Sequence, residues 1–217
     1  MRNHFKKLIY LFLVIGFTVA HGGALEDLFK AVTFDDERTV RELLARGIDP
    51  NSRNEKGQTA LYLALREDSP KTCAVLLDNP QTQIDLANAA GETALMIAAL
   101  KGRTDWLGRL IDRGAKIDGP GNGERPGWTP LHYAASGPEA ASVALLLDRG
   151  ARVDARSPNG TTPLMMAAQY GPEDSVFLLL KKGADARLKN DLGLGVVDFA
   201  TRGGRESLAG RLRAAQR

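Results

Sequence analysis

Few side chains in this sequence could act as a nucleophile, a proton carrier or a metal ligand. The 217 residues contain one cysteine, Cys73, and three histidines, of which His4 and His21 fall in or beside the N-terminal segment. A lone cysteine cannot close a disulfide within the chain or build a thiolate zinc cluster. The remaining histidine, His132, has no second titratable group placed with it. The sequence therefore predicts a protein that is not an enzyme and that needs no metal and no cofactor.

A glycine-rich stretch, Gly119 to Gly123, is a candidate for binding a phosphate group. It consists of Gly-Pro-Gly-Asn-Gly and lacks the lysine and the serine or threonine of a phosphate-binding loop, and no predicted strand leads into it. Lengthening a surface loop costs only roughly a few tenths of a kcal/mol. We therefore interpret the stretch as a tolerated loop insertion.

The elements that would position any functional residue repeat along the chain with a period close to 33 residues. A column of leucines, completed by one valine, comprises Leu28, Leu61, Leu95, Leu131, Leu164 and Val197. An alanine follows three residues after each: Ala31, Ala64, Ala98, Ala134, Ala167 and Ala200. Threonines precede four of the leucines by two residues: Thr59, Thr93, Thr129 and Thr162. Turn glycines stand four residues before the last five members of the column: Gly57, Gly91, Gly127, Gly160 and Gly193.

Each of these columns has a physical reason. A threonine caps the start of a helix because its hydroxyl accepts a hydrogen bond from a backbone N–H that has no partner within the helix. Pro130 and Pro163 follow two of the threonines, at the first helical position, where the missing N–H costs nothing. A later apolar pair, such as Leu146-Leu147, faces inward from a second helix. Each unit is thus a turn and two antiparallel helices, and units must stack because one alone cannot bury its apolar face.

The motif over residues 129–135, Thr-Pro-Leu-His-Tyr-Ala-Ala, and its close variant over 162–168 resemble the ankyrin repeat family. The resemblance covers roughly residues 25–217 and implies an all-α ankyrin repeat solenoid of about six helix–turn–helix units joined by β-turn fingers. We place the units at 24–57, 58–91, 92–127, 128–160, 161–193 and 194–217. The second unit departs from the pattern, because Asn79-Pro80 replaces the glycine that closes the other units.

The resemblance also implies a role for His132, which would bond to threonine and backbone and orient the turn. Cys73 falls in an inward column of the second helix, so we expect a buried and inert thiol. Trp106 falls in the adjacent inward column, and we expect it in the core.

The N-terminal segment, residues 1–24, has the pattern of a secretory signal peptide. Three basic residues precede an apolar run from Leu8 to Ala20, and small residues follow, so that cleavage after Ala20 or after Ala24 would both fit. The 13-residue run is short of the roughly 20 apolar residues that span a bilayer. An uncleaved membrane anchor is the alternative. We expect a periplasmic or secreted protein without stable membrane insertion after signal cleavage.

The charge balance argues against a nucleic-acid partner. Residues 1–24 hold three of the 29 basic residues and no acid, so the remaining 26 basic residues equal the 26 acidic ones. A nucleic-acid-binding face would need a basic stripe. Arginines do gather at the C-terminus, where we expect a solvated face, with contact to an anionic surface as the alternative: Arg202, Arg205, Arg211, Arg213 and Arg217.

The function that the resemblance implies is binding of a protein partner through the concave face of the stack. We expect residues that follow the turn glycine to project there: Gln58, Glu92, Trp128 and Thr161. The predicted contact set is centred on Trp128 and comprises Trp128, Arg125, Tyr170, Gln169, Lys101, Glu92 and Arg66. Trp128 could instead fold back onto Arg125 and stabilise only its own turn. The alternative functions are a secreted effector that acts on host proteins and an enzyme with an unrecognised site.

Overall fold

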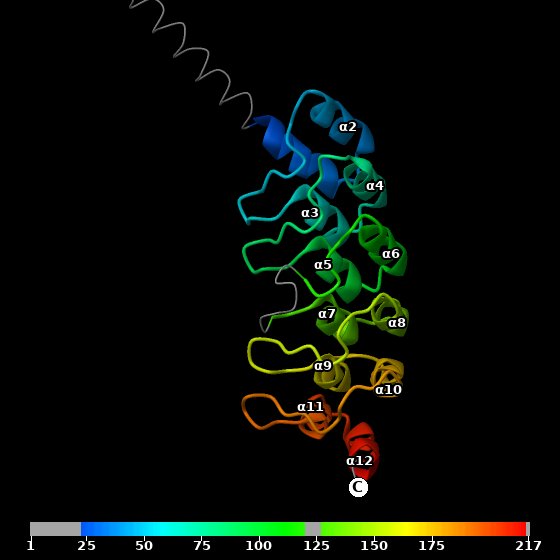
Figure 1. Ribbon diagram of the computed structural model, residues 1–217. Helices are drawn as coiled ribbons and strands as arrows, with labels where there is room; N and C mark the ends of the chain where they lie inside the picture. The colour runs from blue at the N-terminus through cyan, green and yellow to red at the C-terminus, as the bar shows by residue number, and fades with distance from the viewer. Residues whose placement is uncertain (1–22, 120–126, 216–217) are drawn as a thin grey trace, which may run out of the picture. The chain divides into compact units, whose positions relative to one another are not determined.

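The computed structural model describes residues 23–119 and 127–215, which are built from helices and turns (Figure 1). Within these two ranges the extended pairing is limited to two isolated bridges, Arg53 with Thr59 and Lys189 with Gly195. The prediction of an all-α repeat fold is confirmed. The chain divides into two compact units, residues 1–83 (unit 1) and residues 84–217 (unit 2).

Unit 1 pairs a helix over residues 23–33 with three further helices: α2 (Glu37–Ala45), α3 (Ala60–Arg66) and α4 (Pro70–Asp78). Its core holds Leu28 and Leu61, both almost fully buried. Asp35 takes a left-handed conformation at φ 54°, and its carboxylate accepts a hydrogen bond from the Thr72 amide at 2.9 Å. This contact ties the first repeat to the start of α4.

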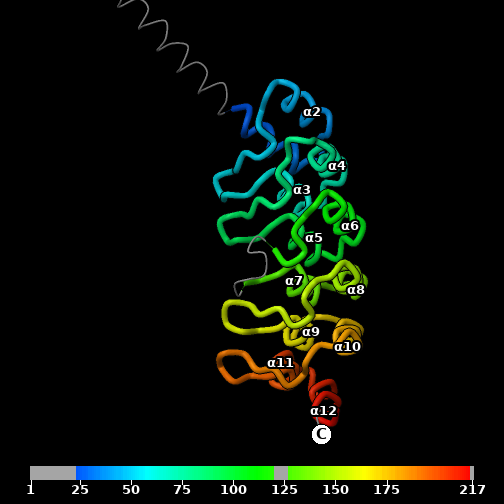
Figure 2. The backbone as a smooth tube through the Cα atoms, viewed as in Figure 1, coloured from blue at the N-terminus to red at the C-terminus, as the bar shows by residue number. Residues whose placement is uncertain are grey.

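Unit 2 stacks four helix pairs. They are α5 (Ala94–Leu100) with α6 (Thr104–Asp112), α7 (Pro130–Ser136) with α8 (Ala140–Asp148), α9 (Pro163–Tyr170) with α10 (Glu173–Lys181), and α11 (Val196–Arg202) with α12 (Glu206–Ala215). The inner helices α5, α7, α9 and α11 form one row, and the turns project from the same side of unit 2 (Figure 2). We call the surface made by these turns and inner helices the inner face of unit 2.

The recurring columns have the structural roles that their spacing predicts. The five leucines of the leucine column are at most 2% exposed. Val197 is half-buried, because it lies in the terminal repeat, and its neighbour Val196 is the buried residue there. The hydroxyls of Thr59, Thr93 and Thr162 accept hydrogen bonds from the amide three residues on, as helix caps do.

The turns are held by a polar residue that the sequence interpretation did not single out. The side-chain oxygens of Asn54, Asn88 and Asn190 each accept hydrogen bonds from the amides two and four residues later, at 2.9–3.0 Å. The glycine that follows three residues after each asparagine has a positive φ, between 71° and 81°. An asparagine side chain that mimics a backbone turn therefore fixes each of these fingers.

The closing turn of the second repeat is formed without glycine. Asn79 is extended, with ψ 122°, and its side-chain oxygen accepts a hydrogen bond from the Gln81 amide at 2.9 Å. The Asn79 carbonyl also accepts a bond from the Thr82 amide at 3.1 Å. An asparagine turn thus does at this position what a left-handed glycine does at the end of α6, α8 and α10.

Candidate protein-binding face

The predicted contact residues do not form one described site. Glu92, Lys101, Trp128, Gln169 and Tyr170 belong to unit 2. Arg66 belongs to unit 1, where it pairs with the neighbouring Glu67 at 3.5 Å, and Arg125 lies outside the described residues. The candidate binding surface therefore comprises the five residues of unit 2.

Tyr170 is the most exposed of these five residues. It is the last residue of α9 and has 62% of its surface exposed, whereas the preceding Gln169 is half-buried. A large aromatic side chain with this exposure is typical of a contact residue in protein interfaces.

Trp128 is more enclosed than its position in the sequence suggested. It is 39% exposed, and its indole lies edge-on to the imidazole of His132, with ring centroids 5.3 Å apart. The Gly127 amide before it donates to the carbonyl of Arg156 in the next finger, at 2.9 Å. Trp128 therefore stabilises the start of α7 and also presents part of its ring to solvent.

Glu92 and Lys101 make hydrogen bonds within the stack of repeats. The carboxylate of Glu92 accepts hydrogen bonds from the Asn88 side chain at 2.8 Å and from the Tyr133 hydroxyl at 3.1 Å. Lys101 follows the last residue of α5 and caps the helix, and its amide donates to the Ile97 and Ala99 carbonyls. Both side chains are half-buried.

The expectation that every residue after a turn glycine projects outward is wrong at two positions. Gln58 is 6% exposed and Thr161 is 2% exposed. The Thr161 amide is drawn inward because it donates to the hydroxyl of Ser157 at 3.0 Å, and the Asn54 side chain bonds to the Gln58 side chain at 3.0 Å. The same turn chemistry that shapes the finger thus buries the residue that follows it.

His132 is fully buried, and its hydrogen-bond partners fix its tautomer. Nδ1 accepts from the Thr129 backbone N–H at 3.2 Å, so Nε2 carries the proton and donates to the Thr161 carbonyl at 3.0 Å. Burial lowers the pKa of His132 to about 4, and the bond to Thr161 opposes part of that shift. A neutral histidine whose two nitrogens are both engaged holds the turn and is not available for proton transfer.

Other chemically interesting residues are also accounted for by packing. Cys73 is buried. Trp106 is half-buried, a correction to its expected place in the core, because its ring lies against the guanidinium of Arg109 at 4.6 Å. Within the glycine-rich stretch only Gly119 is described, with φ 87°, and the remainder lies outside the described residues.

Two of the C-terminal arginines are engaged inside unit 2. Arg211 pairs with the carboxylate of Glu173 and places its guanidinium over the ring of Phe177 at 4.4 Å. Arg205 donates three hydrogen bonds to carbonyls at the end of α9. Arg211 is thus paired with an acidic side chain, and Arg205 is used to hold the end of α9.

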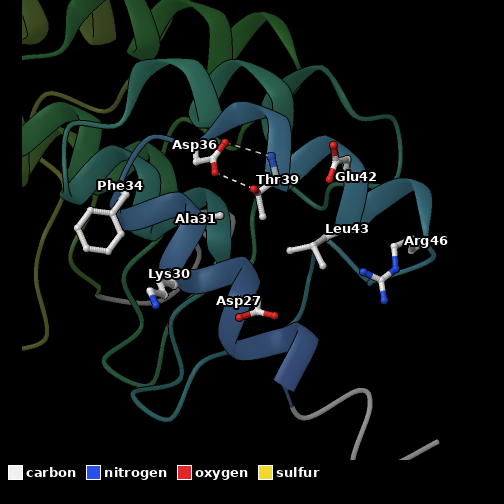
Figure 3. A pocket seen from close by; sticks show the side chains of 9 residues that line it. All are labelled: Asp27, Lys30, Ala31, Phe34, Asp36, Thr39, Glu42, Leu43 and Arg46. Atoms are coloured by element: carbon white, nitrogen blue, oxygen red, sulfur yellow. Dashed lines mark hydrogen bonds between the residues drawn. The ribbon is translucent and has the colours of Figure 1, made fainter.

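Shallow hollows occur among the described residues of unit 1. One, of about 320 Å³, lies between the helix over residues 23–33 and α2 (Figure 3). Its Asp36 carboxylate caps α2 by accepting from the Thr39 amide and hydroxyl, which lowers the pKa of Asp36. Another, of about 870 Å³, is lined by charged side chains of both signs around Phe29 and Leu63.

Across residues 23–119 and 127–215, no group of three histidine, cysteine or acidic side chains is placed to hold a metal ion. In the same ranges, no helix combines the length and the hydropathy needed to cross a membrane.

Comparison with known proteins places the chain in a family. A family model described as ankyrin repeats matches residues 28–120 and 118–190. The chain is 34% identical over 126 residues to a B-cell lymphoma 3 protein homolog of Mus musculus, covering 57% of this chain and 28% of that protein. It is 29% identical over 120 residues to the human transient receptor potential cation channel subfamily A member 1, covering 55% of this chain and 10% of the channel.

A solved structure matches over most of the chain. It is a chain of the complex of the Bd0816 predatory endopeptidase of Bdellovibrio bacteriovorus with the immunity protein Bd3460. The match has a TM-score of 0.72 and 28% sequence identity, and it covers 87% of this chain and 97% of that chain. The sequence motifs, the stacked helix pairs and these matches together show that the chain belongs to the ankyrin repeat family.

Proposed function

We propose that this chain is an exported, non-catalytic protein that binds a protein partner through the inner face of unit 2. The observation that carries the proposal is the stack of ankyrin repeats itself, since repeat solenoids use extended surfaces for binding. Tyr170 and Trp128 supply exposed aromatic surface on these repeats, while His132 and Glu92 are engaged in the framework. Aromatic side chains are the groups most enriched at the centres of protein interfaces.

The partner that we favour is a peptidase, which this chain would inhibit. The structural match covers 97% of one chain in a complex between an endopeptidase and an immunity protein, so that chain consists almost entirely of the shared fold. The residues described for the present chain lack a metal-binding cluster and bury their histidine in a neutral form. Both features favour the role of the immunity protein over that of the endopeptidase.

Export is supported by the N-terminal sequence pattern. A basic start, the apolar run from Leu8 to Ala20 and the small residues after it are typical of a secretory signal peptide. Mass spectrometry of the exported protein tests this point, and we expect a mature chain that begins at His21 or Leu25. Recovery of the full-length chain in the membrane fraction would indicate an uncleaved anchor instead.

A capture experiment tests the binding function. The tagged mature chain, immobilised and exposed to a cell-envelope extract of its own source, should retain a specific protein, and Trp128→Ala with Tyr170→Ala should abolish retention. Asp112→Ala is a matched control, because Asp112 lies on the outer helix α6 and pairs only with a surface arginine among the contacts described. The retained protein should cleave peptide substrates, and added wild-type chain should reduce its rate. Retention that survives the aromatic double substitution would place the binding surface elsewhere.

A further inference from the structure

We infer that Tyr170 is a preorganised anchor of the partner-binding face and that Arg205 is the residue that positions it. The inference rests on the proposed function, in which a protein binds the inner face of unit 2. It moves the centre of the contact from Trp128, where the sequence placed it, to the end of α9. It also assigns a role to a residue of the terminal repeat that the sequence suggested only as part of a charged face.

The exposure of Tyr170 follows from the register of the repeats. Six residues after the leucine column, the four repeats of unit 2 carry Lys101, Gly137, Tyr170 and Gly203. Tyr170 therefore stands between two repeats that have glycine at the same position. The phenol ring meets no side chain from these two positions, which is consistent with its 62% exposure.

The flanking glycines are fixed by close backbone packing. A Cβ atom on Gly137 would lie 2.6 Å from the carbonyl oxygen of Leu100, and one on Gly203 would lie 2.5 Å from that of Gln169. Real Cβ atoms do not approach an oxygen this closely without a shift of the backbone. The space beside Tyr170 is thus a consequence of how the repeats stack.

The backbone that carries Tyr170 is held from the terminal repeat by Arg205. One guanidinium nitrogen, Nη1, donates to the carbonyls of Gly171 at 2.7 Å, Ala167 at 3.0 Å and Ala168 at 3.1 Å. These carbonyls lie at or just past the C-terminal end of α9, where a positive charge is favourable. The Ala167 carbonyl also accepts a hydrogen bond from the Gly171 amide at 3.0 Å. Arg205 therefore bonds to backbone carbonyls that lie before and after Tyr170 in the chain.

The same turn packs against the preceding repeat, and Arg205 is itself held within the terminal repeat. Gly171 approaches the Ala135 carbonyl so closely that a Cβ atom would overlap it. The Arg205 amide donates to the Ala200 carbonyl at 2.9 Å, and the Arg205 carbonyl accepts from the Ala209 amide at 2.9 Å. The anchor is consequently held between two neighbouring repeats.

An exposed aromatic side chain on a held backbone indicates the kind of surface it fits. Tyrosine has few rotatable bonds, so a fixed backbone leaves little conformational entropy to lose on binding. A ring that projects requires a concave pocket in the partner, apolar along its walls and with a polar group where it meets the phenol hydroxyl. In a peptidase partner, a cleft of this kind would connect the anchor to inhibition by occupation of the cleft.

Arg211 provides a matched control for Arg205. Both arginines belong to the terminal repeat and both contact the repeat before it. Arg211 reaches the outer helix α10, at Glu173 and Phe177, and these contacts do not involve the end of α9. Loss of Arg211 removes a comparable inter-repeat contact without releasing the turn that carries Tyr170.

The positioning role is tested without any partner by amide hydrogen exchange on the full mature chain. We expect Arg205→Ala to raise the exchange rate of the Gly171 amide by about tenfold or more, and Arg211→Ala to leave it unchanged. Equal exchange in the wild type and in Arg205→Ala would overturn the positioning role.

The anchor role is tested with the protein retained in the capture experiment, purified and used as the probe. We expect Tyr170→Ala to raise the Kd by about 30-fold or more and Arg205→Ala by about three- to tenfold. Because Arg205 acts through Tyr170, the double variant should bind no more weakly than Tyr170→Ala alone. Arg211→Ala should bind as the wild type does.

Each other result overturns a different part. An unchanged Kd for Tyr170→Ala would show that Tyr170 is not an anchor. Additive losses of affinity in the double variant would show that Arg205 does not act by positioning Tyr170. If the wild-type chain retains nothing, the proposed function and the anchor fail together, whereas the exchange effect of Arg205→Ala would still be seen. If the chain instead self-associates and Tyr170→Ala abolishes that, the occupant is a second copy and the heteromeric partner is ruled out.

Discussion

The fourth and fifth repeats have nearly the same starting motif, Thr-Pro-Leu-x-x-Ala-Ala, and differ in how they secure it. In the fourth repeat His132 links Thr129 to the Thr161 carbonyl of the next repeat. In the fifth repeat the equivalent residue is Met165, whose sulfur lies 3.5 Å from the Thr162 amide. Both side chains are at most 1% exposed. One position in the fold thus accepts a polar tie between repeats or an apolar side chain that fills the same space.

The largest effect should be the same in both repeats, because the leucine column is shared. Leu131 and Leu164 are at most 1% exposed. Truncating either to alanine should lower the free energy of unfolding by about 2–5 kcal/mol. Urea denaturation measures the loss, and Gln169→Ala serves as the half-buried control, with a change of at most about 0.5 kcal/mol. Equal losses at Leu131 and Gln169 would mean that the inward and outward faces are misassigned.

The two repeats should differ in their response to acid. The pKa of His132 is lowered to about 4 in the folded chain, against 6.5 for an ordinary histidine, so between these values the unfolded state binds the proton more readily. Stability is therefore fully present above about pH 6.5 and is lost as the pH falls through 4, by about 3 kcal/mol from this residue. The difference between wild type and His132→Met, measured by urea denaturation at several pH values, isolates this contribution from that of the carboxylates.

The reciprocal change sharpens the same comparison. Met165→His should introduce a second acid-sensitive group, because the new imidazole would be buried as His132 is. A Met165→His variant whose pH dependence matches that of the wild type would show that the burial of His132 depends on its own repeat rather than on the position.

At neutral pH the exchange of histidine for methionine should cost much less. The Thr161 carbonyl also accepts a hydrogen bond from the Ser157 amide at 2.9 Å, so His132→Met does not leave that oxygen without a partner. The expected loss in the free energy of unfolding is that of one hydrogen bond, about 1 kcal/mol. A loss several times larger in thermal or urea denaturation would indicate that the edge-on contact with Trp128 also holds the turn.

The sequence predicted those parts of the fold in which the same residue type recurs from repeat to repeat. Leucine, alanine, threonine and glycine recur at fixed spacing because helix packing, capping and tight turns each need one kind of side chain. It missed polar residues whose type varies, although their spacing was visible. Side chains that accept the amide of the following repeat recur at Asn51, Asp85, Asp118 and Asp154. One of these four acceptors is an amide and the other three are carboxylates, so no single residue type marks the position.

The candidate site was harder to predict for a related reason. The exposure of a side chain depends on its neighbours in other repeats. The sequence indicates those neighbours only through the alignment of one repeat with the next. Thr161 seemed to project because it follows a turn glycine, yet the Ser157 hydroxyl and the His132 imidazole draw it inside. Arg205 seemed to be one charge of a basic face, yet its contacts lie at the end of α9, 34–38 residues earlier in the chain.

The smallest effect should come from the ion pairs that flank the fourth repeat on its outer side. Arg149 of α8's C-terminal turn pairs with Asp112 at 2.8 Å, and Lys182 of the fifth repeat pairs with Asp148 at 2.6 Å. All four side chains are at least 39% exposed, so water and salt screen their attraction. Asp148→Asn should therefore lower the free energy of unfolding by less than about 1 kcal/mol, and the loss should shrink further when urea denaturation is repeated at high salt. A larger and salt-independent loss would show that the outer helices, rather than the buried columns and His132, distinguish how neighbouring repeats are held together.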